Sequence, residues 1–199
     1  MPDFLIDRLL IFSVGFFTII CFALFWLFFD ALRLRFEIKT FLKSVGFILL
    51  GIGFGGALIQ QSAQDIVPFL LWLKVLGFYL IFTAFAFDSH SKFQIGLIIG
   101  IIASFFFHDH AYLALMSFLI TINIFQISYT TKHKDLTPFG AGFLLIFIAE
   151  FFRAVESTKT GSLSFASAFL YFFASLALLY WLWQYLVIRF NLDRKLLKI

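Results

Sequence analysis

Seven apolar stretches divide this chain, and they limit its fold more than any other feature does. A helix needs about 20 mostly apolar residues to cross a bilayer, and most of the stretches approach or exceed that length. In lipid, backbone amides and carbonyls must be hydrogen-bonded within the spanning segment, which excludes open strands. We therefore predict an all-α membrane bundle of seven transmembrane helices. These helices cover residues 9–29, 41–59, 66–87, 93–107, 111–128, 139–152 and 165–188.

The composition fits a membrane environment. Of the 199 residues, 62% are hydrophobic and 13% are charged, whereas a soluble domain carries about 25% charged residues. We interpret residues 1–199 as one integral membrane domain. It divides into three helices within 1–88, a linking helix within 89–110, and three helices with a short tail within 111–199.

Basic residues alternate between the two sides of the predicted bundle. Of the 15 Lys and Arg residues, eleven fall on the side that also carries the C-terminal tail, three fall on the other side, and Lys74 lies within a span. Short cytoplasmic loops carry an excess of Lys and Arg, so we predict an outside N-terminus and a cytoplasmic C-terminus. The cytoplasmic set is Arg33, Arg35, Lys39, Lys43, Lys92, Lys132, Lys134, Arg189, Arg194, Lys195 and Lys198; the outer set is Arg8, Arg153 and Lys159.

Aromatic residues with a polar edge support this orientation. Trp and Tyr are enriched at both membrane–water boundaries, where their rings meet the headgroups. We predict an outer belt of Trp72, Tyr112 and Tyr171. The inner belt comprises Trp26, Tyr129, Trp181, Trp183 and Tyr185.

The second and sixth apolar stretches begin with similar residues, which suggests an internal repeat. Residues 43–47 read KSVGF and residues 139–143 read FGAGF, so that Gly46 and Gly142 are 96 residues apart. Each follows a basic loop. The match predicts two parallel three-helix halves joined by one helix, as in parallel-repeat transporters. A chance match between short apolar strings is the alternative.

A glycine-rich run occupies residues 51–56 (GIGFGG) and fits the G-x-G-x-x-G pattern. Nucleotide binding requires this pattern between a strand and a helix of a soluble unit, and here it lies inside a membrane span. Glycines four residues apart instead let membrane helices approach closely. We therefore predict packing faces at Gly51 and Gly55 and at Gly96 and Gly100.

Three charged residues form a candidate polar cluster inside the membrane. Lys74 lies about 12 Å below the outer end of its helix, at 1.5 Å per residue. Ionisable groups at such depth usually face the bundle interior and mark functional sites. Glu150 is the nearest candidate counterion, and Arg153 follows it on the same helix face. A proton relay or an anion contact is one interpretation. A Lys74 side chain that extends to the membrane surface, beside a local Glu150–Arg153 pair, is the other.

The sequence contains no recognisable set of catalytic residues, and we therefore favour a protein that is not an enzyme. His108 and His110 flank Asp109 and are weak zinc candidates, but adjacent positions in a turn rarely converge on one metal. We therefore expect neither a metal nor a cofactor, and no nucleic-acid partner. No nucleophile elbow is present, and residues 165–188 lack the lysine that a retinal protein needs.

The first two spans carry a resemblance to a known class. Residues 29–35 (FDALRLR) end the first span and residues 43–47 (KSVGF) open the second. This arrangement resembles the seven-helix membrane modules that precede some prokaryotic sensor kinases. The resemblance implies signal sensing in the plane of the cytoplasmic membrane of a prokaryote. Only about ten residues follow the last span, so we expect no output domain on this chain, and signalling would require a separate partner.

We therefore predict a non-enzymatic, sensor-like or partner-binding membrane module. The partner, a membrane or cytoplasmic protein, would contact Arg33, Arg35, Lys39 and the C-terminal tail. Anionic lipid could also bind these basic residues. The alternative is a small-solute transporter with a three-one-three layout, which would resemble carriers of the PQ-loop kind in topology although the chain contains no Pro-Gln pair.

Overall fold

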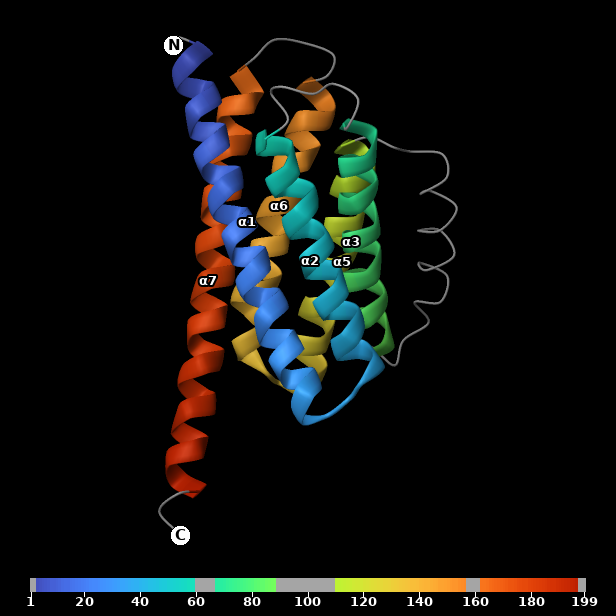
Figure 1. The fold of residues 1–199 in the computed structure, drawn as a ribbon, viewed down its shortest axis with the longest axis vertical. Coiled ribbons are helices and arrows are strands. Elements are labelled where there is room, and N and C mark those ends of the chain that lie inside the picture. The colour runs from blue at the N-terminus through green and yellow to red at the C-terminus, as the bar shows by residue number, and fades with distance from the viewer. Residues whose placement is uncertain (1–2, 60–66, 89–109, 157–161, 197–199) are drawn as a thin grey trace.

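A computed structural model describes residues 3–59, 67–88, 110–156 and 162–196 (Figure 1). Within these ranges the fold is all-α, as predicted. The helices are α1 (Asp3–Leu34), α2 (Ile38–Ile59), α3 (Val67–Asp88), α5 (His110–Thr131), α6 (Thr137–Glu156) and α7 (Ser162–Leu196), with a 3₁₀ turn, η3 (Lys134–Leu136), before α6. The predicted span at 93–107 lies outside the described residues.

Each of the six described α-helices contains a segment long and apolar enough to cross a bilayer. Together they give the chain the architecture of a multi-pass membrane protein. Every described α-helix except α3 is longer than its apolar stretch: α1 has 32 residues and α7 has 35. The hydropathy pattern stops at charged side chains, whereas helical backbone hydrogen bonding continues through Lys and Arg, which are good helix formers.

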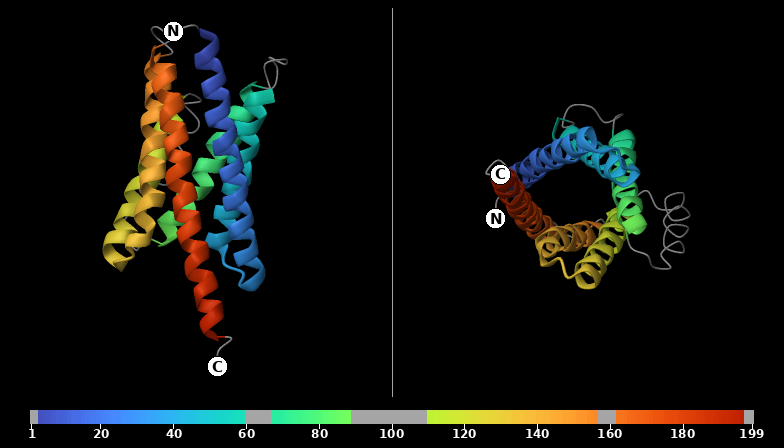
Figure 2. Two further views of the ribbon diagram at one scale, coloured as in Figure 1. Left: turned by 90° about the vertical axis from the view of Figure 1, so that its left-hand side faces the viewer. Right: turned by 90° about the horizontal axis from the view of Figure 1, so that it is seen from below.

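The described helices close into a ring in chain order (Figure 2). Each helix packs on the next along the chain, α3 packs on α5, and α7 returns to pack on α1. At the lower end of the ring, Arg189 of α7 pairs with Asp30 of α1 at 2.9 Å. The end that holds the N-terminus in Figure 1 is called the upper end, and the opposite one the lower end.

Two neighbouring pairs of helices run in the same direction, namely α1 with α7 and α3 with α5 (Figure 1). In α1 and α7, Phe12 lies beside Phe172, with ring centroids 6.1 Å apart, and Asp30 lies beside Arg189 further along both helices. All other sequential neighbours are antiparallel (Figure 1). Consequently α1, α3, α5 and α7 begin at the upper end, and α2 and α6 begin at the lower end.

The direction of α3 relative to α5 follows from their contacts with α6. Phe78 and Phe85 of α3 lie beside Phe143 and Phe139 of α6, so these two helices are antiparallel. His110, the first residue of α5, lies beside Glu150 near the end of α6, so α5 is antiparallel to α6 as well. Hence α3 ends at the lower end of the bundle, and α5 begins at the upper end.

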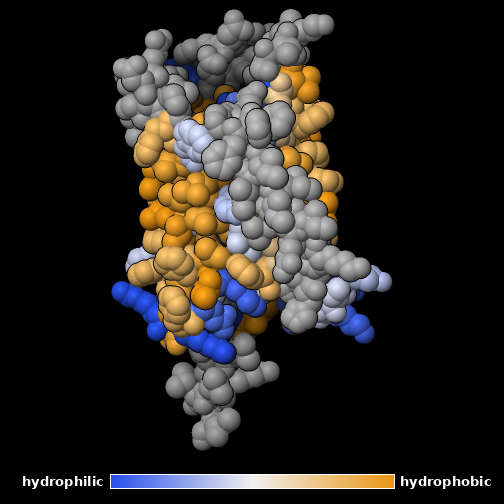
Figure 3. All heavy atoms as spheres, turned by 90° about the vertical axis from the view of Figure 1, so that its right-hand side faces the viewer, coloured by the Kyte–Doolittle hydropathy of each residue, from blue (hydrophilic) through white to orange (hydrophobic). Residues whose placement is uncertain are grey.

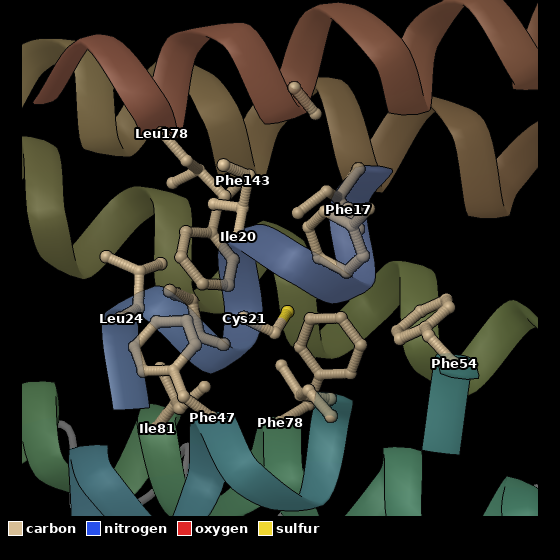
Figure 4. Close-up of a cluster of buried hydrophobic side chains, with 14 of the residues drawn as sticks. Phe17, Ile20, Cys21, Leu24, Phe47, Phe54, Phe78, Ile81, Phe143 and Leu178 are labelled. Atoms are coloured by element: carbon tan, nitrogen blue, oxygen red, sulfur yellow. The ribbon is translucent and has the colours of Figure 1, made fainter. Parts of the chain in front are cut away.

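Packed aromatic and aliphatic side chains fill the space inside the ring. Figure 4 shows Cys21 of α1 among side chains from α2, α3, α6 and α7, and the cysteine itself is fully buried. Aromatic pairs continue this core along the bundle, from Phe17 and Phe54 (5.0 Å between centroids) to Phe139 and Trp181 (4.5 Å). Among the described residues, the interior is therefore a continuous apolar core.

Many large side chains on the outer surface of the bundle are also apolar. Figure 3 shows a broad hydrophobic band across the middle of the face in view, with hydrophilic residues gathered near its lower end. Large apolar side chains such as Ile19 (64% exposed) and Phe173 (52% exposed) point outward. A soluble protein would not leave such a band uncovered, whereas lipid tails would cover it.

Glycines set the spacing between α2 and its neighbours. A Cβ atom built on Gly77 would lie 2.9 Å from the carbonyl oxygen of Gly46, and the reverse distance is also 2.9 Å. The predicted packing residues Gly51 and Gly55 face α1, where they contact Phe22 and Thr18 respectively. The predicted pair Gly96 and Gly100 lies outside the described residues.

Candidate functional site

The carboxylate of Glu150 is the centre of a buried polar cluster near the upper end of the bundle. Glu150 lies on α6 and is fully buried. Its Oε2 atom is 2.6 Å from Nδ1 of His110 on α5, and its Oε1 accepts a hydrogen bond from the Tyr171 hydroxyl on α7. One side chain therefore joins three helices.

This cluster differs from the other polar groups inside the spans. Thr18, Thr121 and Ser175 each donate a hydrogen bond to a carbonyl four residues earlier on their own helix. Such bonds satisfy a hydroxyl without linking helices. Glu150 instead takes its hydrogen bonds from two neighbouring helices. Burial of a carboxylate is costly unless it is paired in this way.

Lys74 is buried on α3, as expected for an intramembrane ionisable residue that faces the interior. Its ammonium nitrogen lies 4.5 Å from the centroid of the Phe54 ring, a cation–π contact. In the described part of the chain, Glu150 contacts His110, which the sequence did not bring into the cluster. Direct pairing of Lys74 with Glu150 stays a prediction. A charged side chain in lipid can be stabilised by an aromatic face as well as by a counterion.

Charge nevertheless connects the three residues singled out in the sequence. Lys74, Glu150 and Arg153 are close enough to act electrostatically on one another. Arg153 also acts on the Tyr171 hydroxyl. The cluster thus comprises Lys74, His110, Glu150, Arg153 and Tyr171, contributed by four helices.

A glycine makes room for Lys74. A Cβ atom on Gly53 of α2 would lie 2.8 Å from Cγ of Lys74 and 3.1 Å from the carbonyl oxygen of Leu70. The absence of a side chain lets α2 lie directly against the lysine stem, with Phe54 of α2 under the ammonium group. The glycine-rich run therefore shapes the environment of the buried lysine.

Aromatic rings form the floor of the cluster. The Tyr171 ring lies 5.7 Å from both Phe17 and Phe54, measured between centroids, and Phe54 in turn contacts Phe78. These rings separate the polar cluster from the middle of the bundle. Because they exclude water, they strengthen the electrostatic interactions above them.

Two members of the predicted outer belt lie inside instead. Tyr112 is 1% exposed and Tyr171 is fully buried, so both rings point into the bundle, whereas Trp72 is 46% exposed. Their level relative to the membrane boundary stays a prediction. A buried tyrosine needs a partner for its hydroxyl, and Glu150 supplies it to Tyr171. Trp181 of the inner belt is likewise buried, at 7%.

The structure describes one of the two weak zinc candidates. His108 lies outside the described residues, and His110 begins α5 with its Nδ1 atom directed at Glu150. No group of three or more His, Cys, Asp or Glu side chains suited to a metal occurs in the described residues. The described cluster is suited to holding a charge and to tying α5, α6 and α7 together.

Comparison with known proteins adds no further constraint. No protein-family model, no curated protein and no solved structure matches this chain.

Proposed function

We propose that this chain is a non-enzymatic membrane module of the sensor-like or partner-binding kind. The upper polar cluster would receive a signal, and the lower end would present a surface to a partner. The observation that carries the proposal is the filled interior: packed side chains occupy the space between the helices, with Cys21 at their centre (Figure 4).

We further propose seven membrane spans, with the lower end in the cytoplasm. The directions of α3 and α5 support an odd number of crossings. α3 ends at the lower end and α5 starts at the upper end, an arrangement that a further crossing between Asp88 and His110 would explain. The excess of basic residues at the lower end supports the orientation. The proposed location is the cytoplasmic membrane of a prokaryote, as in the sensor-kinase modules that the first two spans resemble.

Internal duplication is part of the proposal, and matching glycine contacts support it. A Cβ on Gly46 of α2 would lie 2.9 Å from the carbonyl oxygen of Gly77 on α3, and a Cβ on Gly142 of α6 would lie 3.4 Å from that of Ala174 on α7. The next residues, Phe47 and Phe143, are both fully buried. Their ring centroids are 6.4 Å apart across the interior, as expected for two halves related by an axis along the bundle.

The proposed partner surface lies where α1 and α7 meet at the lower end. α7 extends past the other helices there (Figure 1), and its 35 residues correspond to about 52 Å, well beyond the roughly 30 Å of a hydrocarbon core. The exposed residues Arg33 and Arg35 lie at the adjoining end of α1. A separate output protein would meet this projecting helix.

Labelling of Cys21 tests whether the interior stays closed. Cys21 is the only cysteine of the chain, so no engineering is needed. The purified protein is incubated with N-ethylmaleimide in detergent and in lipid nanodiscs, and intact mass is measured over time. We expect no adduct in the folded protein and a complete adduct after unfolding in SDS.

The matched control moves the thiol to an exposed site. In a Cys21→Ser background, Lys132→Cys at the lower end should react within minutes, because position 132 is exposed. If native Cys21 reacts at a rate close to this control, water reaches the centre of the bundle and the closed-module proposal is wrong.

A small-solute transporter is the second candidate, and two observations favour it. Buried ionisable residues often line ion or solute pathways, and the Glu150 cluster is of this kind. Parallel three-helix halves also occur in carriers. Fast labelling of Cys21 would favour this function, because a carrier has to open its centre to water in turn from each side.

A further inference from the structure

The contact between His110 and Glu150 joins a partly exposed ring to a fully buried carboxylate. The His110 side chain, at the start of α5, is 29% exposed, whereas that of Glu150 on α6 is 0% exposed. Nδ1 of the ring lies 2.6 Å from Oε2 of the carboxylate, which is as short as charge-assisted hydrogen bonds are. A change of charge on the ring therefore acts directly on a carboxylate that solvent does not reach.

The two carboxylate oxygens of Glu150 are both engaged. Oε1 accepts a hydrogen bond from the Tyr171 hydroxyl, and Oε2 faces His110. A metal ion or an organic cation would have to replace these contacts in order to bind the carboxylate. A proton requires only a basic atom, and the imidazole ring supplies one. The proton is therefore the ligand that this arrangement accepts without rearranging.

Other charged and titratable side chains act on the same carboxylate from the surrounding helices. Among the described residues these are Lys74 of α3, Arg153 of α6 itself and Tyr171 of α7. Lysine and arginine keep their charge near neutral pH, and tyrosine ordinarily stays neutral there. Histidine is the type of side chain that most often changes its charge in this range. The imidazole of His110 is therefore the group of the cluster suited to respond to pH.

We propose that the His110–Glu150 pair binds a proton when the solution at the upper end is acidified, and that this proton is the signal which the cluster receives. The inference rests on the sensor-like function proposed above. The imidazole gains the proton and the carboxylate remains the acceptor, so that a hydrogen bond between α5 and α6 becomes an ion pair, which is stronger. The same carboxylate accepts from Tyr171, and the change thereby reaches α7, which extends to the proposed partner surface (Figure 1).

NMR spectroscopy of the full chain in lipid nanodiscs tests the proposal, with the proton itself as the ligand. Histidine and tyrosine rings are isotope-labelled, and spectra are recorded between about pH 8 and pH 5. His110→Asn and Tyr171→Phe identify the two signals of interest. We expect the ring nitrogens of His110 and the hydroxyl-bearing carbon of Tyr171 to change over the same pH interval.

Glu150→Gln removes the negative charge that pairs with the bound proton. The midpoint of the His110 response should fall by about one pH unit, which is a ten-fold loss of proton affinity. His133 is the internal control, because it is exposed in the turn after α5 and should respond equally in both proteins. Circular dichroism verifies that the variant is folded.

Tyr171→Phe provides a second variant that retains the His110–Glu150 contact, and His110 should still respond to pH in it. The proposal would be overturned if the His110 signals stayed constant over this range, if their midpoint were the same in Glu150→Gln, or if Tyr171 did not change together with His110. Fast labelling of Cys21 would reject the closed module and leave these NMR responses unaffected, so the two proposals can fail separately.

Discussion

At the scale of single residues, Glu150 carries the interactions that distinguish this bundle from a purely apolar one. Its two carboxylate oxygens are held by His110 and Tyr171 from neighbouring helices, and Lys74 and Arg153 act on its charge. Removing one partner of a buried charge is strongly destabilising, because the remaining charge is left uncompensated. The cluster is therefore sensitive to the loss of any one member.

Glu150→Gln tests the charge separately from the shape. The amide keeps the size and much of the hydrogen-bonding capacity, but it leaves Lys74 and Arg153 without a compensating carboxylate. We expect a loss of about 2 kcal/mol in the free energy of unfolding. Unfolding in SDS mixed micelles, followed by tryptophan fluorescence and circular dichroism, gives the measurement.

The matched control is Glu37→Gln at the lower end. Glu37 also pairs with a basic residue, Arg35, but both side chains are solvent-accessible, at 44% and 85% exposure. Exposed ion pairs contribute about 0–1 kcal/mol, so this change should have a small effect. Equal effects of the two substitutions would mean that the Glu150 cluster is not a special feature of the fold.

The sequence predicted part of this cluster and missed the rest. Lys74, Glu150 and Arg153 stand out because they are charged within apolar stretches, whereas Tyr171 has the appearance of a boundary aromatic residue. Helical spacing could have revealed it: Ser167, Tyr171 and Ser175 recur every four residues and are all fully buried. On this buried polar face, Tyr171 is the residue that contacts the carboxylate. The contact between His110 and Glu150 depends on distances between helices that no sequence pattern contains.

At the scale of helices, glycine contacts decide how closely α2 and α3 approach. The carbonyl oxygens of Gly46 and Gly77 would each meet a Cβ on the opposite residue at 2.9 Å. Backbone atoms cannot rotate away as a flexible side chain can. Close packing of small residues is the main way in which helices associate in lipid.

Gly77→Ala should therefore separate α2 from α3. We expect a loss of about 1–3 kcal/mol, the range for overpacking a filled core, measured by the same SDS titration. Gly15→Ala is the matched control on α1, where the nearest neighbouring atom to the new Cβ is 3.6 Å away. That variant should keep the wild-type stability or gain up to about 1 kcal/mol from helix propensity. Similar losses for both would refute the packing argument.

Apolar stretches in the sequence located the six described helices but not all of their ends. α2 begins at Ile38 rather than Phe41, and α7 continues to Leu196 rather than Ile188. Hydropathy reports where lipid surrounds a helix, whereas the helix itself ends where backbone hydrogen bonding stops. For α7 the difference matters, because the extension supplies the projecting surface proposed for a partner.

At the scale of the whole molecule, the ring encloses a filled core. The sequence indicated an apolar bundle, but it could not show which helices are neighbours. The contact between α1 and α7 joins the two ends of the chain, and the contact between Phe47 and Phe143 joins the two halves. Such long-range contacts depend on the complementary shapes of side chains far apart in the sequence.

We propose that the chain crosses the membrane between α3 and α5, which would give an odd number of spans. Single-cysteine variants in a Cys21→Ser background test it at two exposed positions, Phe87→Cys at the end of α3 and Ala111→Cys at the start of α5. A membrane-impermeant maleimide is applied to intact cells and, in parallel, to permeabilised cells. Arg8→Cys and Lys132→Cys serve as reference positions for the upper and lower ends.

We expect the reagent to label Ala111→Cys in intact cells and Phe87→Cys only after permeabilisation, matching Arg8→Cys and Lys132→Cys respectively. Labelling of positions 87 and 111 from the same side of the membrane would contradict the proposed topology and, with it, the assignment of the lower end to the cytoplasm.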